Sequence, residues 1–433
     1  MKRILLVGNG AREHVIAETL LRNGNVELGV YGGAVNPGIR ELASEYRVGN
    51  VMDFGPLQEF AREFKPDFAF IGPDDPIGAG AADALLEVGV KSVAPLKSLA
   101  RLESSKSFTR DLVEKYKIPG NPLYRVFTAE EGLREWMNEL GEYVVKADGL
   151  LGGKGVQVSG EHLKSVDEGI VFAKASIEKF GRVVVEEKFV GVEFSLMSFC
   201  DGTHVVDMPA VQDHKRAFEG DTGPNTGGMG TYSDADGSLP FLTAADLAAA
   251  HDITVKVAEA LKAECGAEFK GIMYGGFMAT KDGVRLIEYN ARFGDPEVMN
   301  VLPLLKTDFV EVCERIIAGT LEAVEFEQRA TVVKYVCPEG YPTAPVKDEK
   351  IVVGAVPEGV HVYYGSVDAR EDGLYLLGSR AVAMVGVAET LAEAEQLAEA
   401  AAMAVTGPVF HRKDVGTAKL IAERVEMMRG LRS

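Results

Sequence analysis

Short apolar runs alternate with helical patterns along the first hundred residues of the chain. Residues 4–7, 28–31 and 68–71 have the length and the composition of buried strands, and a turn with glycine or proline follows each of them. Strands that alternate with helices in this way predict a parallel sheet covered by helices. Ligands bind such sheets beyond the carboxyl ends of the strands, so we expect functional residues in these turns.

A helix is predicted to begin after Ser104 or Ser105, because Phe108, Leu112 and Tyr116 then recur on one face. The proline-rich residues 118–122 end this helix. Strand patterns follow, and a glycine-rich loop joins the first two strands between residues 143 and 158. We expect further strands at 182–189, 193–199, 205–211, 271–279 and 284–290, and a helix at 245–265.

A polar stretch with five glycines, residues 213–230, interrupts this strand-rich region. Loops of that length inside a compact domain are usually functional or mobile, so we expect this stretch to belong to a site. After about residue 325, short strands at 331–336, 361–364 and 381–387 precede a helix at 391–405. Thr390 and Glu393 form a capping box at the start of that helix.

Composition narrows the class of protein. The 433 residues carry 46 basic and 65 acidic side chains, and the net charge of −19 argues against nucleic-acid binding, which needs clustered Lys and Arg. Four scattered cysteines argue against a disulfide framework or a zinc ribbon. No segment approaches the ~20 apolar residues of a membrane span, and the first apolar run is too short for a signal peptide. We therefore expect a cytoplasmic protein with no membrane or nucleic-acid partner.

The first glycine-bearing turn, residues 8–14 (GNGAREH), follows a strand and opens a helix. It resembles the dinucleotide-binding fingerprint, but Glu13 stands at the third glycine position and the second strand ends without an acid for a ribose, which disfavours an NAD site. Free backbone N–H groups at the helix start, together with Arg12, still suit a phosphate. A plain turn without a ligand is the alternative.

A second glycine-rich segment, residues 148–155 (DGLLGGKG), lies between two strands. It fails as a Walker A loop because Asp148 replaces the first glycine and Gly155, rather than Ser or Thr, follows Lys154. A Gly-Lys-Gly loop can instead lay backbone N–H groups and one ammonium over a triphosphate. A flexible hairpin tip with a solvated lysine is the other interpretation.

The densest polar segment is residues 285–297 (RLIEYNARFGDPE). Because side chains alternate on a strand, Glu288, Asn290 and Arg292 are expected on one face, with Ile287 and Tyr289 in the opposite core. A carboxylate beside an amide oxygen suits Mg²⁺, which completes its coordination with phosphates and water. The alternative is the polar face of an edge strand.

Together these segments resemble the ATP-grasp superfamily and, within it, the family of phosphoribosylamine–glycine ligases. The most specific carriers are residues 212–216 (QDHKR), 220–230 (GDTGPNTGGMG) and 288–297. Weaker pieces are residues 8–14, 36–38, 72–74, 105–106, 145–149, 153–155 and 186–187. Their order, spacing and joint presence along almost the whole chain carry the resemblance.

The resemblance implies an α/β fold in three parts: an N-terminal parallel-sheet, Rossmann-like domain at residues 1–103, a two-part ATP-grasp domain at 104–325 with a small mobile lobe at about 122–190, and a small C-terminal α+β domain at 326–433. It also implies a monomer that uses ATP with Mg²⁺ or Mn²⁺. ATP would phosphorylate the carboxylate of glycine, and the amine of 5-phosphoribosylamine would attack the glycyl phosphate. Glycinamide ribonucleotide, ADP and phosphate would result, in an early step of purine synthesis.

The same resemblance implies roles for the matching residues. Residues expected to contact ATP are Lys106, Lys146, Gly153, Lys154, Gly155, Glu186, Glu187 and Glu193, with the two adjacent glutamates at the adenine. The metal ligands would be Glu288 and Asn290. The expected catalytic residues are Arg292, Lys146 and Asp213. Substrates would be held by Gly10, Arg12, Glu13, Asn36, Pro37, Gly38, Gly72, Asp74, Lys215, Gly228, Arg292 and Asp295.

Three departures from the family pattern stand out. Ala11 replaces a glycine of the first turn, and residues 72–75 read Gly-Pro-Asp-Asp where Gly-Pro-Glu is usual, so the expected sugar-phosphate pocket is altered. Residues 274–280 contain no acid, which argues against a complete two-metal site.

Two alternative functions remain open. One is another ATP-grasp enzyme, either a carboxylate–amine ligase or a carboxylase. The other, from a different class, is a catalytically silent nucleotide-binding protein.

Overall fold

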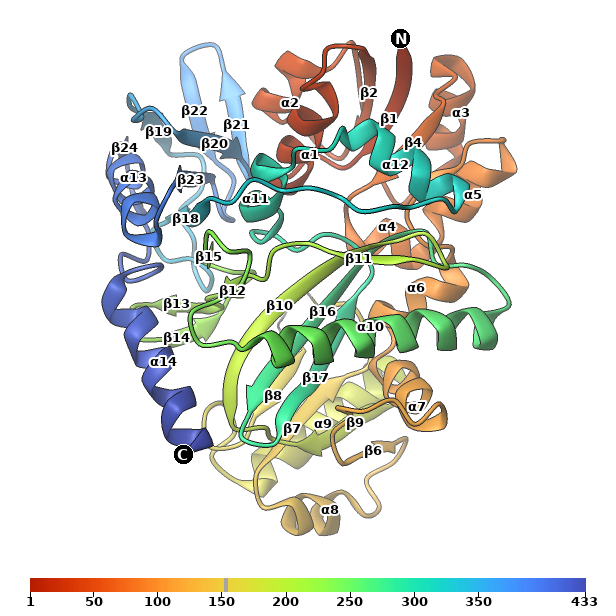
Figure 1. Ribbon diagram of the computed structural model, residues 1–433, viewed down its shortest axis with the longest axis vertical. Helices are drawn as coiled ribbons and strands as arrows, with labels where there is room; N and C mark the ends of the chain where they lie inside the picture. The colour runs from red at the N-terminus through yellow and green to blue at the C-terminus, as the bar shows by residue number, and fades with distance from the viewer. Residues whose placement is uncertain (152–154) are drawn as a thin grey trace.

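The computed structural model describes residues 1–151 and 155–433. Its N-terminal part is a parallel sheet in the order β3-β2-β1-β4-β5, at the top of Figure 1. Ile4 and Leu6 of β1 share a core with α1, whereas Leu5 and Val7 share one with α3. Because both faces are covered, the strands are continuous apolar runs. The elements are β1 (Lys2–Val7), α1 (Ala11–Leu21), β2 (Val26–Gly32), α2 (Pro37–Leu42), β3 (Glu45–Val48), α3 (Phe54–Phe64), β4 (Phe68–Ile71), α4 (Asp74–Ala79), α5 (Ala81–Glu87), β5 (Ser92–Val93) and α6 (Lys97–Ser104).

A small antiparallel sheet, β6-β9-β7-β8, forms a lobe at the bottom of Figure 1. Tyr143 and Val145 of β7 and Val183 of β9 face Trp136 of α8 and Ala173 of α9 in a hydrophobic core separate from the larger ones. The lobe is therefore packed largely by its own side chains. Its elements are β6 (Tyr124–Phe127), α8 (Leu133–Leu140), β7 (Tyr143–Ala147), β8 (Val156–Val158), α9 (Val166–Phe180) and β9 (Val183–Glu187).

A third sheet, β11-β10-β16-β17, lies between the small lobe and the N-terminal sheet, and α10 runs across it in Figure 1. The N-cap residue Thr243 and Asp246 form a capping box that begins α10. Ser105 caps α7 by accepting a hydrogen bond from the Phe108 N–H, as the sequence predicts. The elements are α7 (Lys106–Lys115), β10 (Gly191–Cys200), β11 (Val205–Asp207), α10 (Ala244–Cys265), β16 (Gly271–Thr280) and β17 (Gly283–Asn290).

The polar stretch that was expected to be a loop contains strands. β12 (Gln212–Asp213) pairs with β15 (Gly230–Ser233), and β15 in turn pairs with β18 (Ala330–Pro338) of the C-terminal region. Between them, β13 (Arg216–Phe218) and β14 (Thr222–Asn225) form a hairpin. A simple loop is therefore the wrong prediction for residues 213–230. The partner strand of β15 lies about a hundred residues further along the chain, so no local pattern could reveal the pairing.

β18 lies inside the sheet β12-β15-β18-β23-β20, and β25 also pairs with it; a second sheet follows the order β21-β22-β19-β24. α14 leaves these sheets and packs along β10 and β16 (Figure 1). The remaining elements are α11 (Val298–Val301), η1 (Leu302–Leu304), α12 (Phe309–Ala318), β19 (Lys350–Val353), β20 (Val360–Tyr364), β21 (Val367–Arg370), β22 (Gly373–Leu376), β23 (Val382–Ala388), α13 (Leu391–Met403), β24 (Val405–Thr406), β25 (Val409–Phe410) and α14 (Ala418–Arg432).

This architecture confirms the predicted fold class: a parallel N-terminal sheet, a central region in two parts and a small C-terminal α+β region. Residues of the N-terminal region, the small lobe, the third sheet and the C-terminal region all line one cavity. Among the residues that the structure describes, no helix is long and apolar enough to cross a membrane.

Candidate functional site

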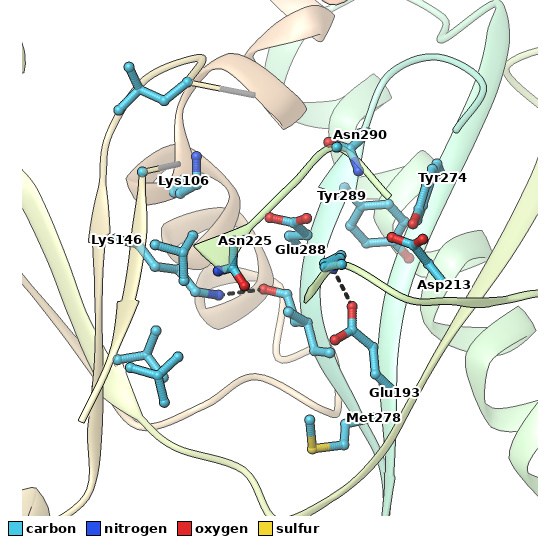
Figure 2. Close-up of a pocket in the computed structure, with 18 of the residues that line it drawn as sticks. Lys106, Lys146, Glu193, Asp213, Asn225, Tyr274, Met278, Glu288, Tyr289 and Asn290 are labelled. Carbon is cyan, nitrogen blue, oxygen red and sulfur yellow. Dashed lines mark hydrogen bonds and ion pairs between the residues drawn. The ribbon is translucent and has the colours of Figure 1, made fainter. Parts of the chain in front are cut away.

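A cavity of about 710 Å³ lies between the small lobe and the third sheet and reaches the N-terminal and C-terminal regions. In Figure 2, Lys106 and Lys146 lie on one side of this cavity, and Glu193 and Asp213 lie on the other, with Glu288 between them. The cations that line it are Arg12, Lys106, Arg110, Lys146, Lys215, Arg216, Arg292, Arg380 and Arg424, with Lys188 near the small lobe. The same lining contains eleven Asp and Glu side chains, so cations and carboxylates alternate around the cavity and offer partners both for phosphate groups and for a divalent cation.

A buried ion triad joins the small lobe to α7. Lys146 Nζ lies 2.5 Å from Glu186 Oε1 and donates to the Ile287 carbonyl at 2.8 Å. Arg110 donates to both oxygens of Glu186, at 2.8 and 3.0 Å. Burial lowers the pKa of Lys146, and although burial opposes it, the Arg110 and Lys146 cations hold the pKa of Glu186 below its ordinary value. The Glu186 carboxylate is thus charged and already fully engaged, so a ligand at this end meets the two cations instead.

Other residues expected at the nucleotide line the same end of the cavity. Glu187 Oε1 accepts hydrogen bonds from Arg285 Nη2 at 2.7 Å and from the Leu123 N–H at 2.8 Å. Lys106 Nζ donates to the Gly149 carbonyl at 3.1 Å, which places it under the glycine-rich loop. Gly155 lines the cavity, whereas Gly153 and Lys154 lie outside the described residues.

A bulge at Ile287 changes which side chains of β17 face the cavity. The pairing of β16 with β17 shifts register between Gly276 and Phe277, so Ile287 and Glu288 both line the cavity. The prediction that Ile287 points into the opposite core is therefore wrong. Tyr289 also lines the cavity, although it is buried and its hydroxyl lies 2.9 Å from Thr254 Oγ1 of α10, so the predicted core position applies only to the hydroxyl end of this side chain. Bulges are common beside functional sites because they re-aim side chains in this way.

Glu288 and Asn290 suit one hard divalent cation. Burial opposes ionisation of Glu288, but Lys215, Lys106 and Lys146 hold its pKa below the ordinary value. Gly276 lies directly opposite Glu288 on β16 and has no side-chain oxygen that could bind a metal. Within the described part of the chain, no cluster of three or more His, Cys, Asp or Glu is arranged for a metal ion. One carboxylate and one amide oxygen, completed by phosphates and water, match the way Mg²⁺ is commonly bound.

Asp213 lies in a different electrostatic environment from Glu288. Burial and the nearby Glu297 carboxylate raise the pKa of Asp213 well above its ordinary value, against the attraction of Lys215. Glu297 accepts a hydrogen bond from the Tyr274 hydroxyl at 2.5 Å, and Lys215 forms an ion pair with Glu193. Asp213 is therefore poised to bind a proton, whereas Glu288 is held ionised.

The expected catalytic and sugar-binding groups meet at the far end of the cavity. Arg292 Nη2 lies 2.9 Å from Glu103 Oε1, and Arg12 Nε lies 2.7 Å from Glu13 Oε1. Both arginines donate to the Phe293 carbonyl, at 3.2 and 3.3 Å. Although burial opposes it, the two arginines lower the pKa of Asp74. This end of the cavity therefore holds two arginines, each of which is already paired with a carboxylate.

Apart from two glycines at its margin, five residues predicted to bind substrate do not line this cavity: Glu13, Asn36, Pro37, Gly38 and Gly72. The Asn36 side chain is 1% exposed; it caps α2 and donates to the Asn9 and Tyr364 carbonyls at 3.0 and 2.6 Å. A Cβ on Gly38 would lie 1.9 Å from the His14 ring, and one on Gly72 would lie 2.1 Å from Glu13. These residues shape the turns, and a direct role at a ligand stays a prediction for them.

Gly10 and Gly228 also stand at the margin of the cavity. The Gly10 N–H donates to Glu13 Oε2 at 2.6 Å, and Gly10 lines a smaller hollow of about 240 Å³ that shares Asp295 and Arg380 with the large cavity. Gly228 has a φ of 111°, and a Cβ there would lie 2.8 Å from Asp213 Oδ1. Only glycine fits this close approach to the acid.

Matches to models of known families show the family to which the chain belongs. Residues 2–103, 104–298 and 331–418 match, in order, the models of the N domain, the ATP-grasp (A) domain and the C domain of phosphoribosylglycinamide synthetase. The chain belongs to the phosphoribosylglycinamide synthetase family. The family is one of ATP-dependent ligases, and the resemblance predicted from the sequence motifs is confirmed.

Relatives in the synthetase family match along the whole chain. Phosphoribosylamine–glycine ligase of Pyrococcus furiosus is 47% identical over 436 residues, which cover 100% of this chain and 98% of the relative. The crystal structure of the phosphoribosylamine–glycine ligase of Thermotoga maritima has a TM-score of 0.80 at 29% identity and covers 95% of this chain and 99% of that one. Biotin carboxylase of Campylobacter jejuni, in complex with β,γ-ATP, shares the fold with a TM-score of 0.72 at 14% identity, covering 99% of this chain and 95% of that one.

In this member of the synthetase family, sequence reasoning missed several arginines of the site. Arg380, from the C-terminal region, donates to the Gly227, Gly228 and Asp295 carbonyls at 2.7, 3.0 and 2.9 Å. Its Nη2 also lies 3.1 Å from Asp295 Oδ2, whose other oxygen accepts a hydrogen bond from the Tyr335 hydroxyl at 2.6 Å. Arg110, Arg380 and Arg424 stand in no recognisable motif, so only their position in space reveals them.

Proposed function

We propose that the chain joins glycine to 5-phosphoribosylamine at the expense of ATP, giving glycinamide ribonucleotide, ADP and phosphate in purine synthesis. The observation that carries this proposal is the match of all three synthetase domains, in order, on a chain 47% identical along its length to proteins named phosphoribosylamine–glycine ligase. The cavity between these domains supports it, because its lysines and arginines can pair with the phosphate groups of ATP and of the sugar.

The first step is phosphoryl transfer to glycine. Lys106, Lys146 and Arg110 would neutralise the triphosphate and hold it in line with the amino acid, which is the main requirement of such a step. Bound Mg²⁺ or Mn²⁺, held by Glu288 and Asn290, would supply further positive charge to the phosphate oxygens. A carboxylate oxygen of glycine attacks the γ-phosphorus, the bond from that phosphorus to the β,γ-bridging oxygen breaks, and ADP leaves. Arg292 would orient the glycine carboxylate.

The second step is attack of the sugar amine on glycyl phosphate. The amine nitrogen bonds to the carbonyl carbon, the carbon–oxygen bond to phosphate breaks, and one amine proton must be removed. Asp213, whose pKa is raised by burial and by Glu297, suits the role of proton acceptor. The amide and inorganic phosphate result.

The sugar phosphate would occupy the N-terminal end of the cavity, where Arg12 and Arg292 provide cations and Asp74 and Asp295 provide acceptors for its hydroxyls. Glu13, which was predicted to bind substrate, would act by holding Arg12 in place. Gly10 and Gly228 would allow the close approach of the backbone. We keep residues 1–103, 104–325 and 326–433 as the three domains, with residues 122–190 as the moving lobe.

We further propose a cytoplasmic monomer. Exposed large apolar side chains come from many different elements of the described chain, which favours a protein without a single apolar interface. Cys200, Cys313 and Cys337 are free and buried, which fits a reducing compartment.

The decisive experiment measures ADP formation by the purified protein with glycine or phosphoribosylamine omitted in turn. We expect turnover only when both are present. With glycine labelled by ¹⁸O in its carboxylate, label should appear in the released phosphate, because that oxygen remains bonded to phosphorus. ADP formation that does not need glycine, or phosphate without label, would overturn the proposal; turnover with another carboxylate–amine pair would favour the alternative ligase.

A further inference from the structure

The hairpin of β13 and β14 lines the cavity but is anchored from the C-terminal segment. Its residue Asp221 has a φ of 53°, a conformation that few residues other than glycine adopt. Arg412, which is 1% exposed, donates to Asp221 Oδ1 at 2.7 Å and to the Arg216 carbonyl at 3.1 Å. Arg424 of α14 forms an ion pair with the other carboxylate oxygen. Asp221 is thus held between two cations.

A second set of contacts fixes the same hairpin. Asp414 accepts a hydrogen bond from the Gly220 N–H at 2.9 Å and binds Arg412 through both oxygens, at 2.9 and 2.6 Å. The rings of Phe218 and Phe410 lie 6.1 Å apart. The backbone conformation at the turn therefore depends on residues that follow the hairpin by about two hundred positions.

The hairpin in turn presents polar groups to the ligand space. Figure 2 shows Asn225 pointing into the cavity between Lys146 and Glu288. Arg216 Nη1 lies 3.2 Å from His162 Nε2 and 3.6 Å from a Glu161 oxygen, both in the small lobe. A shift of the hairpin would move these groups relative to the cations that face the nucleotide.

We propose that Arg424 is a positioning residue for nucleotide binding: through Asp221 it holds the β13–β14 hairpin where Asn225 and Arg216 face the bound ATP. The identity of the nucleotide rests on the proposed function. α14, which carries Arg424, extends beyond residues 331–418, the part that matches the synthetase C domain. If the hairpin is correctly placed for only a fraction of the time, the apparent dissociation constant rises by the inverse of that fraction.

The test is direct titration of the full-length protein with a non-hydrolysable ATP analogue and Mg²⁺. Arg424→Met should raise the dissociation constant about fivefold, as expected for losing one partly exposed ion pair that biases the hairpin. The KM for ATP should rise in parallel with the dissociation constant. Because Arg424 also borders the cavity, the double variant described below separates an effect through Asp221 from a direct contact with the nucleotide. Arg424→Lys should recover most of the affinity.

Arg432→Met is the matched control on the same helix. Arg432 binds Asp246 at 2.7 and 2.9 Å, outside the cavity, so this variant should keep the wild-type dissociation constant. The double variant Asp221→Asn/Arg424→Met should bind like Asp221→Asn alone, because Arg424 acts through Asp221.

An unchanged constant in Arg424→Met, an equal loss in Arg432→Met, or additive effects in the double variant would each overturn the inference. Wild-type protein that binds the analogue but forms no ADP with glycine and phosphoribosylamine would overturn the proposed function and leave the hairpin inference standing.

Discussion

At the residue scale, two acids of one cavity are driven to opposite protonation states. Glu288 faces Lys215, Lys106 and Lys146, and its pKa falls, whereas Asp213 faces Glu297 and its pKa rises. Pairs of acids whose environments push their pKa values apart commonly divide the roles of charged ligand and proton carrier. The two side chains therefore call for different experiments.

Glu288→Gln should abolish metal-dependent turnover while keeping the fold. The amide cannot replace the charge that the carboxylate brings to a divalent ion, so we expect kcat to fall by about 100-fold or more. The thermal midpoint should fall modestly, because the cations around Glu288 lower its pKa and its charge therefore stabilises the folded state. A variant that retains wild-type kcat at saturating Mg²⁺ would contradict the metal assignment.

Asp213 should set the acidic limb of the pH profile. Because its pKa is raised, the fraction of Asp213 able to accept a proton falls as the pH drops through a value above the ordinary ~3.9 of aspartate, and the rate falls with it. We expect Asp213→Asn to lose about 100-fold in kcat and to lose this limb. The measurement is kcat/KM between pH 5 and 9; an acidic limb that stays at the same pH in Asp213→Asn would assign it to another group.

At the scale of elements, helix caps and turns follow from the local sequence, but the other contacts of the capping residues depend on which elements pack against them. Ser105 and Thr390 begin α7 and α13 as predicted, and α13 ends at Met403, two residues before the predicted end. The motif at residues 36–38 is equally local: Asn36 caps α2. Its side chain, however, also binds Tyr364 of β20, so the turn connects the N-terminal sheet to the C-terminal region.

Gly38→Ala should therefore destabilise the protein rather than remove a substrate contact. The new methyl group would lie 1.9 Å from the His14 ring, whose Nδ1 accepts the Tyr364 N–H at 3.0 Å. We expect the free energy of unfolding to fall by about 1–3 kcal/mol, with the KM for phosphoribosylamine unchanged. Gly55→Ala is the control, because its nearest atom lies 3.6 Å away. A stable variant with a raised KM would instead support the predicted substrate role of residues 36–38.

At the scale of the whole molecule, the small lobe has a hydrophobic core of its own. Its core of large side chains includes Trp136, whose indole Nε1 donates to the Val185 carbonyl at 2.9 Å while Arg125 stacks 3.9 Å from the ring centroid. Connections to the rest of the molecule are mainly polar, through Lys146, Glu186 and Arg110. Small cores bury less apolar surface per residue, so we expect this lobe to unfold locally at lower denaturant than the rest of the molecule.

Trp136, the one tryptophan in the sequence, makes that opening measurable. In a urea titration we expect its fluorescence to change at lower urea than far-UV circular dichroism does. ATP should shift the fluorescence transition upward, by about 2.7 kcal/mol at a hundredfold excess over its dissociation constant. Lys146→Met should reduce that shift, since the nucleotide then loses a lobe contact. Coincident transitions with and without ATP would show that the lobe does not open separately.

Features that depend on near neighbours along the chain could be predicted from the amino-acid sequence. Apolar runs predicted the parallel strands, hydroxyl residues predicted the helix starts, and the order of short motifs predicted the synthetase family together with Glu288 and Asn290 as cavity residues. These features follow from propensity, periodicity and spacing, which a linear pattern contains.

Features that depend on contacts between distant segments became visible with the folded structure. It brought Arg110 to Glu186, Arg380 to Asp295 and Arg424 to Asp221, at separations of 76, 85 and 203 residues. It also placed Ile287 on the cavity face through a bulge and joined β15 to β18. An ion pair or a strand register needs two segments that lie close together in space. The linear sequence contains both segments but does not indicate which of them are neighbours in the fold.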